Sequence, residues 1–256
     1  MSAVNQSLTK APIFDDFNWR FEYKYHLNIN QYLAIKSAIT PHMIIDDYTL
    51  VKPDKKYFVS SLYFDSLFLN AFHEKLDGNS ERLKLRLRTY EKTPHTVDFL
   101  KAEIKIRKNV TTEKYVTLIE VPDYQYFMSN KHWPKHFENN PILDEFERYY
   151  HLKTQTPMVL IQYEREGYRA RSKEQIRITF DHRVRSTQSQ ELFPSNPILR
   201  EHYPGVIVLE IKCNKQQPNW LHALVQRFGL CIIPNSKYAQ GIVFSLPSVV
   251  TPSWSS

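Results

Sequence analysis

A run of alternating cations and leucines is the feature that most restricts how this chain can fold. In the stretch RLKLRLRTYE, residues 82–91, the basic residues are Arg82, Lys84, Arg86 and Arg88, and the residues between them are Leu83, Leu85 and Leu87. Side chains of a β-strand point to opposite faces in turn, so the stretch predicts a strand with one cationic face and one leucine face. A single strand of this kind is also typical of an antiparallel sheet whose cations lie in water.

The same period of two recurs in five other predicted strands, so the charged face belongs to a whole sheet. Its rows are Glu22, Lys24 and His26; Lys101, Glu103, Lys105 and Arg107; Tyr163 and Arg165; Arg177, Thr179, Asp181 and Arg183; and Glu210 and Lys212. The opposite faces of these strands carry residues such as Tyr25, Ile104 and Phe180. We therefore expect the apolar faces to pack under helices and the charged faces to meet across a closed sheet, which inverts an ordinary small barrel.

Element positions favour an α+β fold. Predicted strands span residues 19–27, 57–64, 82–90, 97–107, 114–121, 158–168, 175–183 and 206–213, and predicted helices span 29–39, 66–76, 123–130, 142–152 and 218–228. The helices do not alternate with strands as in a parallel sheet. We predict a closed eight-stranded antiparallel β-tunnel with a charged lumen and helices packed outside. It forms a single domain over residues 15–246, with tails at 1–14 and 247–256.

Composition narrows the class of partner. The chain has 5 glycines in 256 residues and carries neither GxGxxG nor GxxxxGK[ST], so a dinucleotide fold and a P-loop have no support. The net charge of +7 indicates an anionic partner. The cations alternate with leucines and not with exposed aromatic residues, which argues against nucleic acid. Neither a signal peptide nor a membrane span is recognisable, so we expect a cytoplasmic protein, with Cys213 and Cys231 as reduced structural thiols.

A lumen lined mainly by cations repels itself when it is empty, and desolvating it is costly unless an anion compensates the charge. Arginine forks and lysine point charges match phosphate oxygens, and repeated cations along a tunnel match a repeated anion such as triphosphate or polyphosphate. A divalent metal ion held by the few carboxylates would bridge phosphate oxygens. Periodicity therefore predicts a polyanion-binding protein.

The sequence also resembles a known family at these positions. The motifs are FEYKY at 21–25, YFD at 63–65, KLRLRTY at 84–90, AEIK at 102–105, YER at 163–165, RITFD at 177–181, LEIK at 209–212 and SKY at 236–238. In this order they are similar to the VTC domain, the polyphosphate polymerase domain of the vacuolar transporter chaperone complex. That domain is part of the triphosphate tunnel metalloenzyme (CYTH-like) superfamily.

The resemblance implies transfer of the γ-phosphate of ATP to a growing polyphosphate chain with Mn²⁺ or Mg²⁺. It implies Ser236 and Lys237 as catalytic residues near the transferring phosphoryl group and Glu210 as the metal ligand, with Glu22 and Glu103 as possible second ligands. Glu103 is equally consistent with an ion pair to a lumen cation. The implied phosphate ligands are Lys24, Arg86, Arg88, Lys105 and Arg165, and the implied tunnel-wall contact is Tyr163. Arg177 and Lys212 are added to the phosphate ligands because the period of two places them on the same inward face.

One departure from the superfamily bears on the reaction. Tunnel hydrolases typically open with ExExK, whereas the first matching position here is Arg20, followed by Glu22 and Lys24. Fewer carboxylates weaken the case for a second metal ion and an activated water, so the sequence favours a polyphosphate polymerase. A triphosphatase acting on inorganic triphosphate or nucleotides and a non-catalytic polyphosphate- or nucleotide-binding module remain as alternatives. ATP, triphosphate or polyphosphate is the expected partner.

Overall fold

Ten strands form one antiparallel sheet in the computed structural model, which describes residues 21–109, 111–214, 216–234 and 236–247. Eight strands follow one path in the order β1-β10-β8-β7-β3-β4-β5-β6. Their bounds are β1 Phe21–Leu27, β3 Tyr57–Asp65, β4 Glu81–Thr89, β5 Leu100–Lys108, β6 Thr111–Ile119, β7 Thr156–Ala170, β8 Ile176–Gln188 and β10 Ile207–Cys213. Two short strands lie off this path: β2, Met43–Ile45, pairs with β7, and β9, Arg200–Glu201, pairs with β8.

Seven α-helices accompany the sheet in the described part of the chain, which confirms the α+β class. They are α1 Ile29–Ile39, α2 Asp47–Leu50, α3 Asn70–Leu76, α4 Val121–Asn130, α5 Pro141–Leu152, α6 Asn219–Arg227 and α7 Lys237–Ser245, with short 3₁₀ turns at Pro94–Thr96 and Lys135–Phe137. The sequence patterns did not predict α2 or α7. Among the described residues, no helix has the length and apolar character needed to cross a membrane.

All eight predicted strands are present, but the prediction of a closed eight-stranded tunnel is not met. The sheet has ten strands, and no ladder joins β1 to β6 within the described residues. A period of two determines which face a side chain occupies, whereas closure depends on strand tilt and stagger along the whole sheet. Arg20 and the predicted tails, apart from residue 247, lie outside the described residues.

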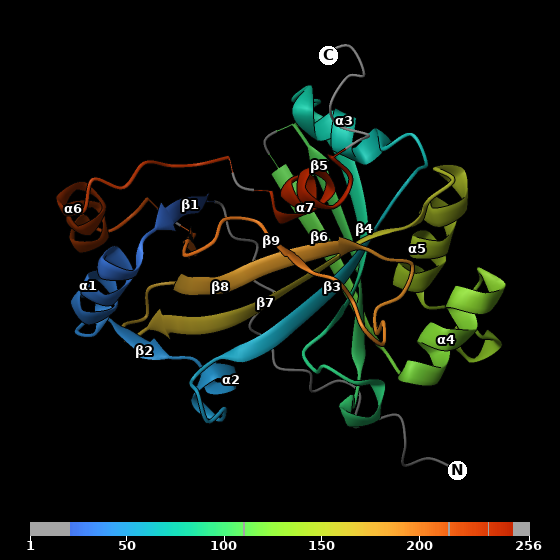
Figure 1. Cartoon of the computed structure of the whole chain (residues 1–256), viewed down its shortest axis with the longest axis horizontal. Coiled ribbons are helices and arrows are strands. Elements are labelled where there is room, and N and C mark those ends of the chain that lie inside the picture. The colour runs from blue at the N-terminus through green and yellow to red at the C-terminus, as the bar shows by residue number, and fades with distance from the viewer. Residues whose placement is uncertain (1–20, 110, 215, 235, 248–256) are drawn as a thin grey trace.

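The sheet nevertheless bends so that its charged face, called here the inner face, turns toward itself. Strands β7 and β8 run across the direction of β3 and β4 (Figure 1). Glu22 on β1 and Lys105 on β5 lie close enough that the charge of each acts on the pKa of the other, although five strands separate β1 from β5 on the path. The two walls of the inner face therefore oppose each other.

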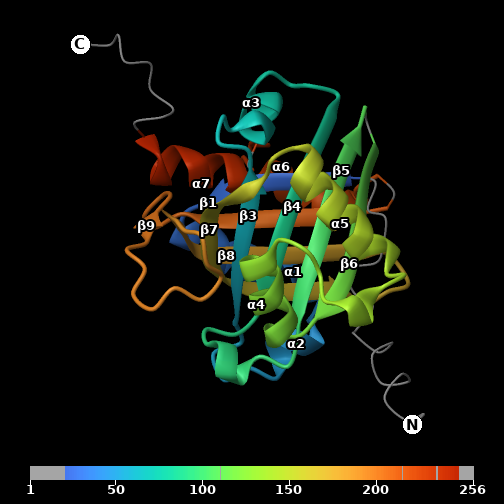
Figure 2. The same ribbon diagram turned by 90° about the vertical axis from the view of Figure 1, so that its right-hand side faces the viewer.

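Two hydrophobic clusters cover the outer face. The first joins β1, β8 and β10 to α1 and α6 through residues that include Ile35, Phe180 and Leu221. The second contains the three leucines of the alternating run, Leu83, Leu85 and Leu87, beside Phe127 of α4 and Phe146 of α5. Helices α4 and α5 lie over β4 and β5 (Figure 2). The leucine face is therefore buried beneath helices, as predicted.

A third hydrophobic cluster lies on the inner face, where α7 packs on β7 and β8. The inner row of β7 is apolar here, with Val159 and Ile161, and Ile242 of α7 packs beside them. At Gly241 a β-carbon would lie 2.9 Å from Ile161 Cδ1 and 3.2 Å from Val159 Cγ2, so the helix backbone approaches the sheet too closely for a larger residue. Helix α7 therefore fills one end of the inner face.

A buried carboxylate ties α7 to the rest of the fold. Asp65 at the end of β3 is fully buried and accepts hydrogen bonds from the backbone N–H groups of Ser66, Ala71 and Phe72, which caps α3. The hydroxyl of Tyr238 in α7 also donates to Asp65 Oδ2. One side chain thus joins β3, α3 and α7.

We expect Leu85→Ala to lower the free energy of unfolding by about 2 to 5 kcal/mol, because the side chain is fully buried beneath α4 and α5 and its loss leaves a cavity. Urea denaturation followed by circular dichroism measures this. Leu152→Ala is the matched control: Leu152 is 64% exposed, so its loss should change stability by no more than about 0.5 kcal/mol. Equal effects of the two substitutions would contradict the burial of the leucine face.

Candidate functional site

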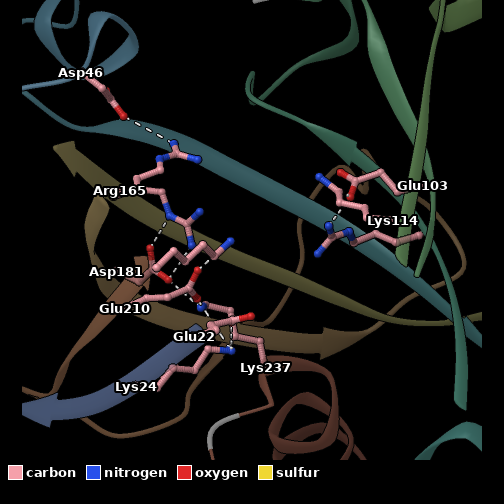
Figure 3. A network of polar contacts seen from close by, with 12 residues as sticks. Glu22, Lys24, Asp46, Glu103, Lys114, Arg165, Asp181, Glu210 and Lys237 are labelled. Carbon is pink, nitrogen blue, oxygen red and sulfur yellow. Dashed lines mark hydrogen bonds and ion pairs between the residues drawn. The ribbon is translucent and has the colours of Figure 1, made fainter. Parts of the chain in front are cut away.

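The predicted site residues lie together on the inner face. Their cationic side chains fall into groups, and each group surrounds one buried carboxylate. Figure 3 shows Glu103 and Lys114 on one wall and Lys24, Asp181, Glu210 and Lys237 on the other. The first wall belongs to β4, β5 and β6, and the second to β1, β7, β8, β10 and α7. Residues far apart in sequence thus form one charged site.

Glu103 organises the wall formed by β4, β5 and β6. Its side chain is 1% exposed; Oε2 accepts a hydrogen bond from Arg86 and lies 3.3 Å from Lys114 Nζ, and Oε1 lies 3.6 Å from Arg88 Nε. Arg86 also donates to the Tyr63 hydroxyl at 2.8 Å, and Arg88 to Ser61 Oγ at 3.1 Å. Of the two roles considered for Glu103, this arrangement favours the ion pair, because its oxygens are surrounded by cations.

Asp181 organises the opposite wall. Arg165 donates to it in a bidentate pair, from Nε at 2.6 Å and Nη2 at 2.8 Å, and Lys237 Nζ lies 2.5 Å from Oδ2. Burial would raise the pKa of Asp181, but the charges of Arg165 and Lys237 lower it to about 2. Asp181 therefore stays ionised and holds two of the predicted phosphate-handling residues together. Tyr163 packs beside both, with its ring centre 5.1 Å from Arg165 Cζ and 5.0 Å from Lys237 Nζ.

Glu210 lies between two lysines on neighbouring strands. Its oxygens are 3.0 Å from Lys212 Nζ and 3.7 Å from Lys24 Nζ, and Lys24 is also 2.8 Å from Glu22. Although burial would raise the pKa of Glu210, the charges of Lys212 and Lys24 hold it well below its usual value. The neighbouring charge of Glu210 and burial act to raise the pKa of Glu22, yet Lys24 and other lysines leave it lowered overall.

A divalent metal ion would need ligands from this group. No cluster of three or more carboxylate, histidine or cysteine side chains suited to a metal occurs among the described residues. Glu210 and Glu22 can supply two carboxylates, and Mg²⁺ in phosphate-transfer sites is commonly held by one or two carboxylates together with substrate phosphates. The donor set therefore fits a metal ion that binds with a phosphate ligand and does not form a cage of its own.

Helix α7 places the Ser236–Lys237 pair at the site. Ser236 is the N-cap: its Oγ accepts from the backbone N–H of Ala239 at 3.3 Å, and Lys84 Nζ lies 3.4 Å from the same oxygen. Lys237 then reaches Asp181 from the first turn. Because α7 packs along β7 and β8, the pair is held at the junction of the two walls.

Arg177 lies at another end of the inner face. Its Nη2 is 3.4 Å from Asp46 Oδ2 and 3.4 Å from the Tyr57 hydroxyl, although its backbone pairs with Lys212. The remaining predicted phosphate ligand, Lys105, pairs with Lys84 on β4 and faces Glu22 of the other wall. Burial, together with Lys24, Lys212 and Arg86, lowers the pKa of Lys105 despite the opposing charge of Glu22.

Lys84 is a residue of the inner face that the predicted set of site residues lacked, as Lys114 and Asp181 are. It stands in the same inner row as Arg86 and Arg88, so the period of two already placed it there, but the assignment did not include it. Its Nζ lies 4.7 Å from the centre of the Tyr238 ring and next to Ser236. The charged groups that face it are Lys105 of β5, Lys24 of β1, Arg82 of its own strand, and Lys75 and Glu74 of α3. Burial and these cations lower the pKa of Lys84 to about 7.

We expect a polyanion bound at the inner face to cause proton uptake at Lys84, and ATP serves as the probe. The depressed pKa means that the free amine is largely neutral above pH 7, whereas a bound polyanion stabilises the ammonium and raises its pKa. Metal-free affinity should then fall as pH rises above 7, by up to about tenfold per pH unit. Calorimetry at pH 8 in buffers of different ionisation enthalpy measures the proton uptake.

Lys84→Arg is the matched control for this measurement, since arginine stays charged and ATP contributes its own protons equally to both proteins. The variant should bind ATP with less proton uptake and a flatter pH dependence than the wild-type protein. Identical uptake by the two proteins would contradict the assignment to Lys84.

Comparisons with known proteins identify the family of this chain and support its fold. The family model described as the VTC domain matches residues 19–246. No curated protein matches the chain. The solved structure of a candidate adenylate cyclase from Bacillus halodurans has a TM-score of 0.50 and 12% identity, over 84% of this chain and 92% of that one.

A candidate adenylyl cyclase from Hippeastrum, described as having a dominant triphosphatase activity, is similar over 90% of this chain and 99% of its own, with a TM-score of 0.51 and 14% identity. Identities this low show a shared fold alone. The family model, however, spans every strand of the sheet and both members of the Ser236–Lys237 pair. The chain belongs to the VTC domain family.

Proposed function

We propose that this protein is a metal-dependent polyphosphate polymerase, which transfers the γ-phosphate of ATP to a growing polyphosphate chain. The observation that carries the proposal is the inner face itself, where cations from seven strands and α7 outnumber the carboxylates among them. A row of cations matches a repeated anion better than a single phosphate, because each added phosphate meets another positive charge. In this proposal the inner face acts as the wall of a tunnel. Membership of the VTC domain family supports it.

Arg86, Arg88 and Arg165 would bind non-bridging phosphate oxygens, with their carboxylate partners holding each guanidinium in place before substrate arrives. Phosphoryl transfer leaves a protein little covalent work beyond positioning and neutralising charge. The terminal phosphate oxygen of the acceptor chain would attack the γ-phosphorus of ATP, the bond from that phosphorus to the bridging oxygen would break, and ADP would leave. Lys237 and Ser236 would stabilise the transferring group.

Glu210, with Glu22, would hold Mn²⁺ or Mg²⁺ together with the phosphates. When bound, the ion neutralises negative charge on phosphate oxygens. The two lysines beside Glu210 keep the carboxylate ionised, so it would be available to a metal ion that shares it with them.

Incubation of the pure protein with ATP and Mn²⁺, followed by separation of the products by chain length, tests this function. The expected products are polyphosphate chains and ADP. Release of orthophosphate alone from ATP or triphosphate would favour a triphosphatase in place of the polymerase. Tight binding of triphosphate without any product, with either metal ion, would favour a binding module.

Two substitutions separate turnover from binding. Glu210→Gln keeps the shape of the side chain but removes its charge, so metal-dependent turnover should collapse while metal-free triphosphate binding survives. Lys237→Ala should lower turnover by about 10²-fold, as expected when a preorganised donor to the transition state is lost. Turnover by quenched-flow or endpoint assay and affinity by calorimetry give the two readouts.

Glu145→Gln is the control for both substitutions, because Glu145 is a partly exposed carboxylate on α5 whose ion pair is with Arg148 of the same helix. It should leave turnover and binding unchanged. If Glu210→Gln retained full metal-dependent turnover, the proposed metal role of Glu210 would be wrong.

A further inference from the structure

Three tyrosines meet beside α2, where that helix packs against β7. The ring centre of Tyr48 lies 6.0 Å from that of Tyr57 and 6.2 Å from that of Tyr90. The ring centres of Tyr57 and Tyr90 are 5.9 Å apart. We call these residues the tyrosine cluster. Tyr57 is 5% exposed, whereas Tyr48 and Tyr90 are half-buried, so parts of these two rings remain accessible.

The cluster belongs to the inner face and not to the outer core. Tyr57 shares the inward row of β3 with Ser61 and Tyr63, and Tyr90 follows Arg86 and Arg88 in the inward row of β4. None of the three tyrosines packs into the two clusters that cover the outer face. The aromatic surface is therefore continuous with the cationic one.

Tyr48 is held in place by the packing of α2 on β7. Asp46 caps α2 by accepting from the Thr49 N–H at 2.9 Å, and its own N–H donates to the Gly167 carbonyl at 2.8 Å. The Gly167 N–H donates to Thr49 Oγ1 at 2.8 Å. A β-carbon at Gly167 would lie 1.8 Å from Asp46 Oδ2, so only glycine permits this contact. Tyr48 thus sits on a fixed turn and not on a loose loop.

Cations border the cluster on two sides. Lys101 Nζ lies 5.3 Å from the centre of the Tyr90 ring, and Arg177 donates to the Tyr57 hydroxyl at 3.4 Å. Arg165 pairs with Tyr57 across the β3–β7 ladder. Contacts then continue from Arg165 to Asp181 and from Asp181 to Lys237, so a connected chain of residues joins the cluster to the Ser236–Lys237 pair.

Aromatic faces next to phosphate-binding cations match a ligand that carries both a flat ring and phosphates. An aromatic side chain can stack on any nucleobase, because every base has a π-face. Tyrosine offers such a stacking surface and has few rotamers to immobilise on binding. Inorganic triphosphate or polyphosphate has no group that would use such a surface. The alternative, that the tyrosines serve only to pack α2 against the sheet, predicts no preference between these ligands.

We propose that the tyrosine cluster binds the base of a nucleoside triphosphate whose phosphates lie along the inner-face cations. The proposal rests on the proposed function in taking those cations as phosphate ligands, and it adds where the nucleoside lies. The donor nucleotide would therefore bind with its base beside α2 and its phosphates directed toward α7.

Calorimetry of ATP and of inorganic triphosphate, both without metal, tests the proposal in the full-length protein. Tyr90→Leu and Tyr48→Leu should each lower ATP affinity by about tenfold and leave triphosphate affinity unchanged. Tyr90→Phe, which keeps the ring, should retain ATP affinity. Tyr126→Leu is the control, since Tyr126 is 40% exposed on α4 at the outer surface, and it should change neither affinity.

A second measurement uses only the wild-type protein, so it does not depend on whether the substituted proteins fold. Saturation-transfer NMR on the wild-type protein should show the adenine protons of ATP in closer contact with the protein than the ribose protons. Equal losses for ATP and triphosphate in both leucine variants, or no loss for either ligand, would overturn the base site while the proposed function stands. A wild-type protein that bound neither ligand would overturn the proposed function, and this proposal with it.

Discussion

The pairing of buried carboxylates with arginines and lysines on the inner face is the interaction on which the rest of the structure depends. Removing several like charges from water is costly, and two charged walls could not approach each other without compensation. Glu103, Asp181 and Glu210 each bind at least two cations, one group on the first wall and two on the second. These ion pairs offset part of the repulsion between the two walls in the absence of a ligand, but they do not neutralise the net positive charge of the inner face. Burial and then the positive charge that remains around them lower the pKa values of Lys84 and Lys105.

The hydrophobic core and the charged groups lie on opposite faces of the same strands. The outer face buries leucine, isoleucine and phenylalanine beneath four helices, and burial of this kind supplies most of the favourable free energy of folding. The charged pairs of the inner face add little net stability, because the cost of desolvating them offsets their attraction, although removal of one partner alone is destabilising. In the proposed function these charges bind phosphates. Since alternate residues of one strand serve the two faces, a substitution of Leu85 acts on the outer core, whereas a substitution of Arg86 acts on the charged inner face.

Much of this arrangement could be predicted because a period of two is a local signal. It placed Leu85 under helices and Arg86 on the inner face, and it located all eight strands of the main path. Closure could not be predicted, because it depends on the coiling of the whole sheet. Helix α2 has only 4 residues, too few to show a period, and α7 is fixed by tertiary packing of Gly241 on β7. A signal for α7 did exist: the inward row of β7 changes from Arg165 and Tyr163 to Ile161 and Val159, which indicates that something apolar covers that end.

The carboxylate of Asp65 has a consequence for the order in which the protein assembles. Asp65 can cap α3 as soon as β3 and α3 are formed, but its bond from Tyr238 requires a helix that follows every strand of the sheet in chain order. As the chain emerges from the ribosome, the cationic sheet can therefore complete its hydrogen bonding before Lys237 arrives. Helix α7, which follows the whole sheet in chain order, then adds Ser236 and Lys237 to a folded, positively charged scaffold, so a nascent chain would pass through a stage that has the scaffold without this pair.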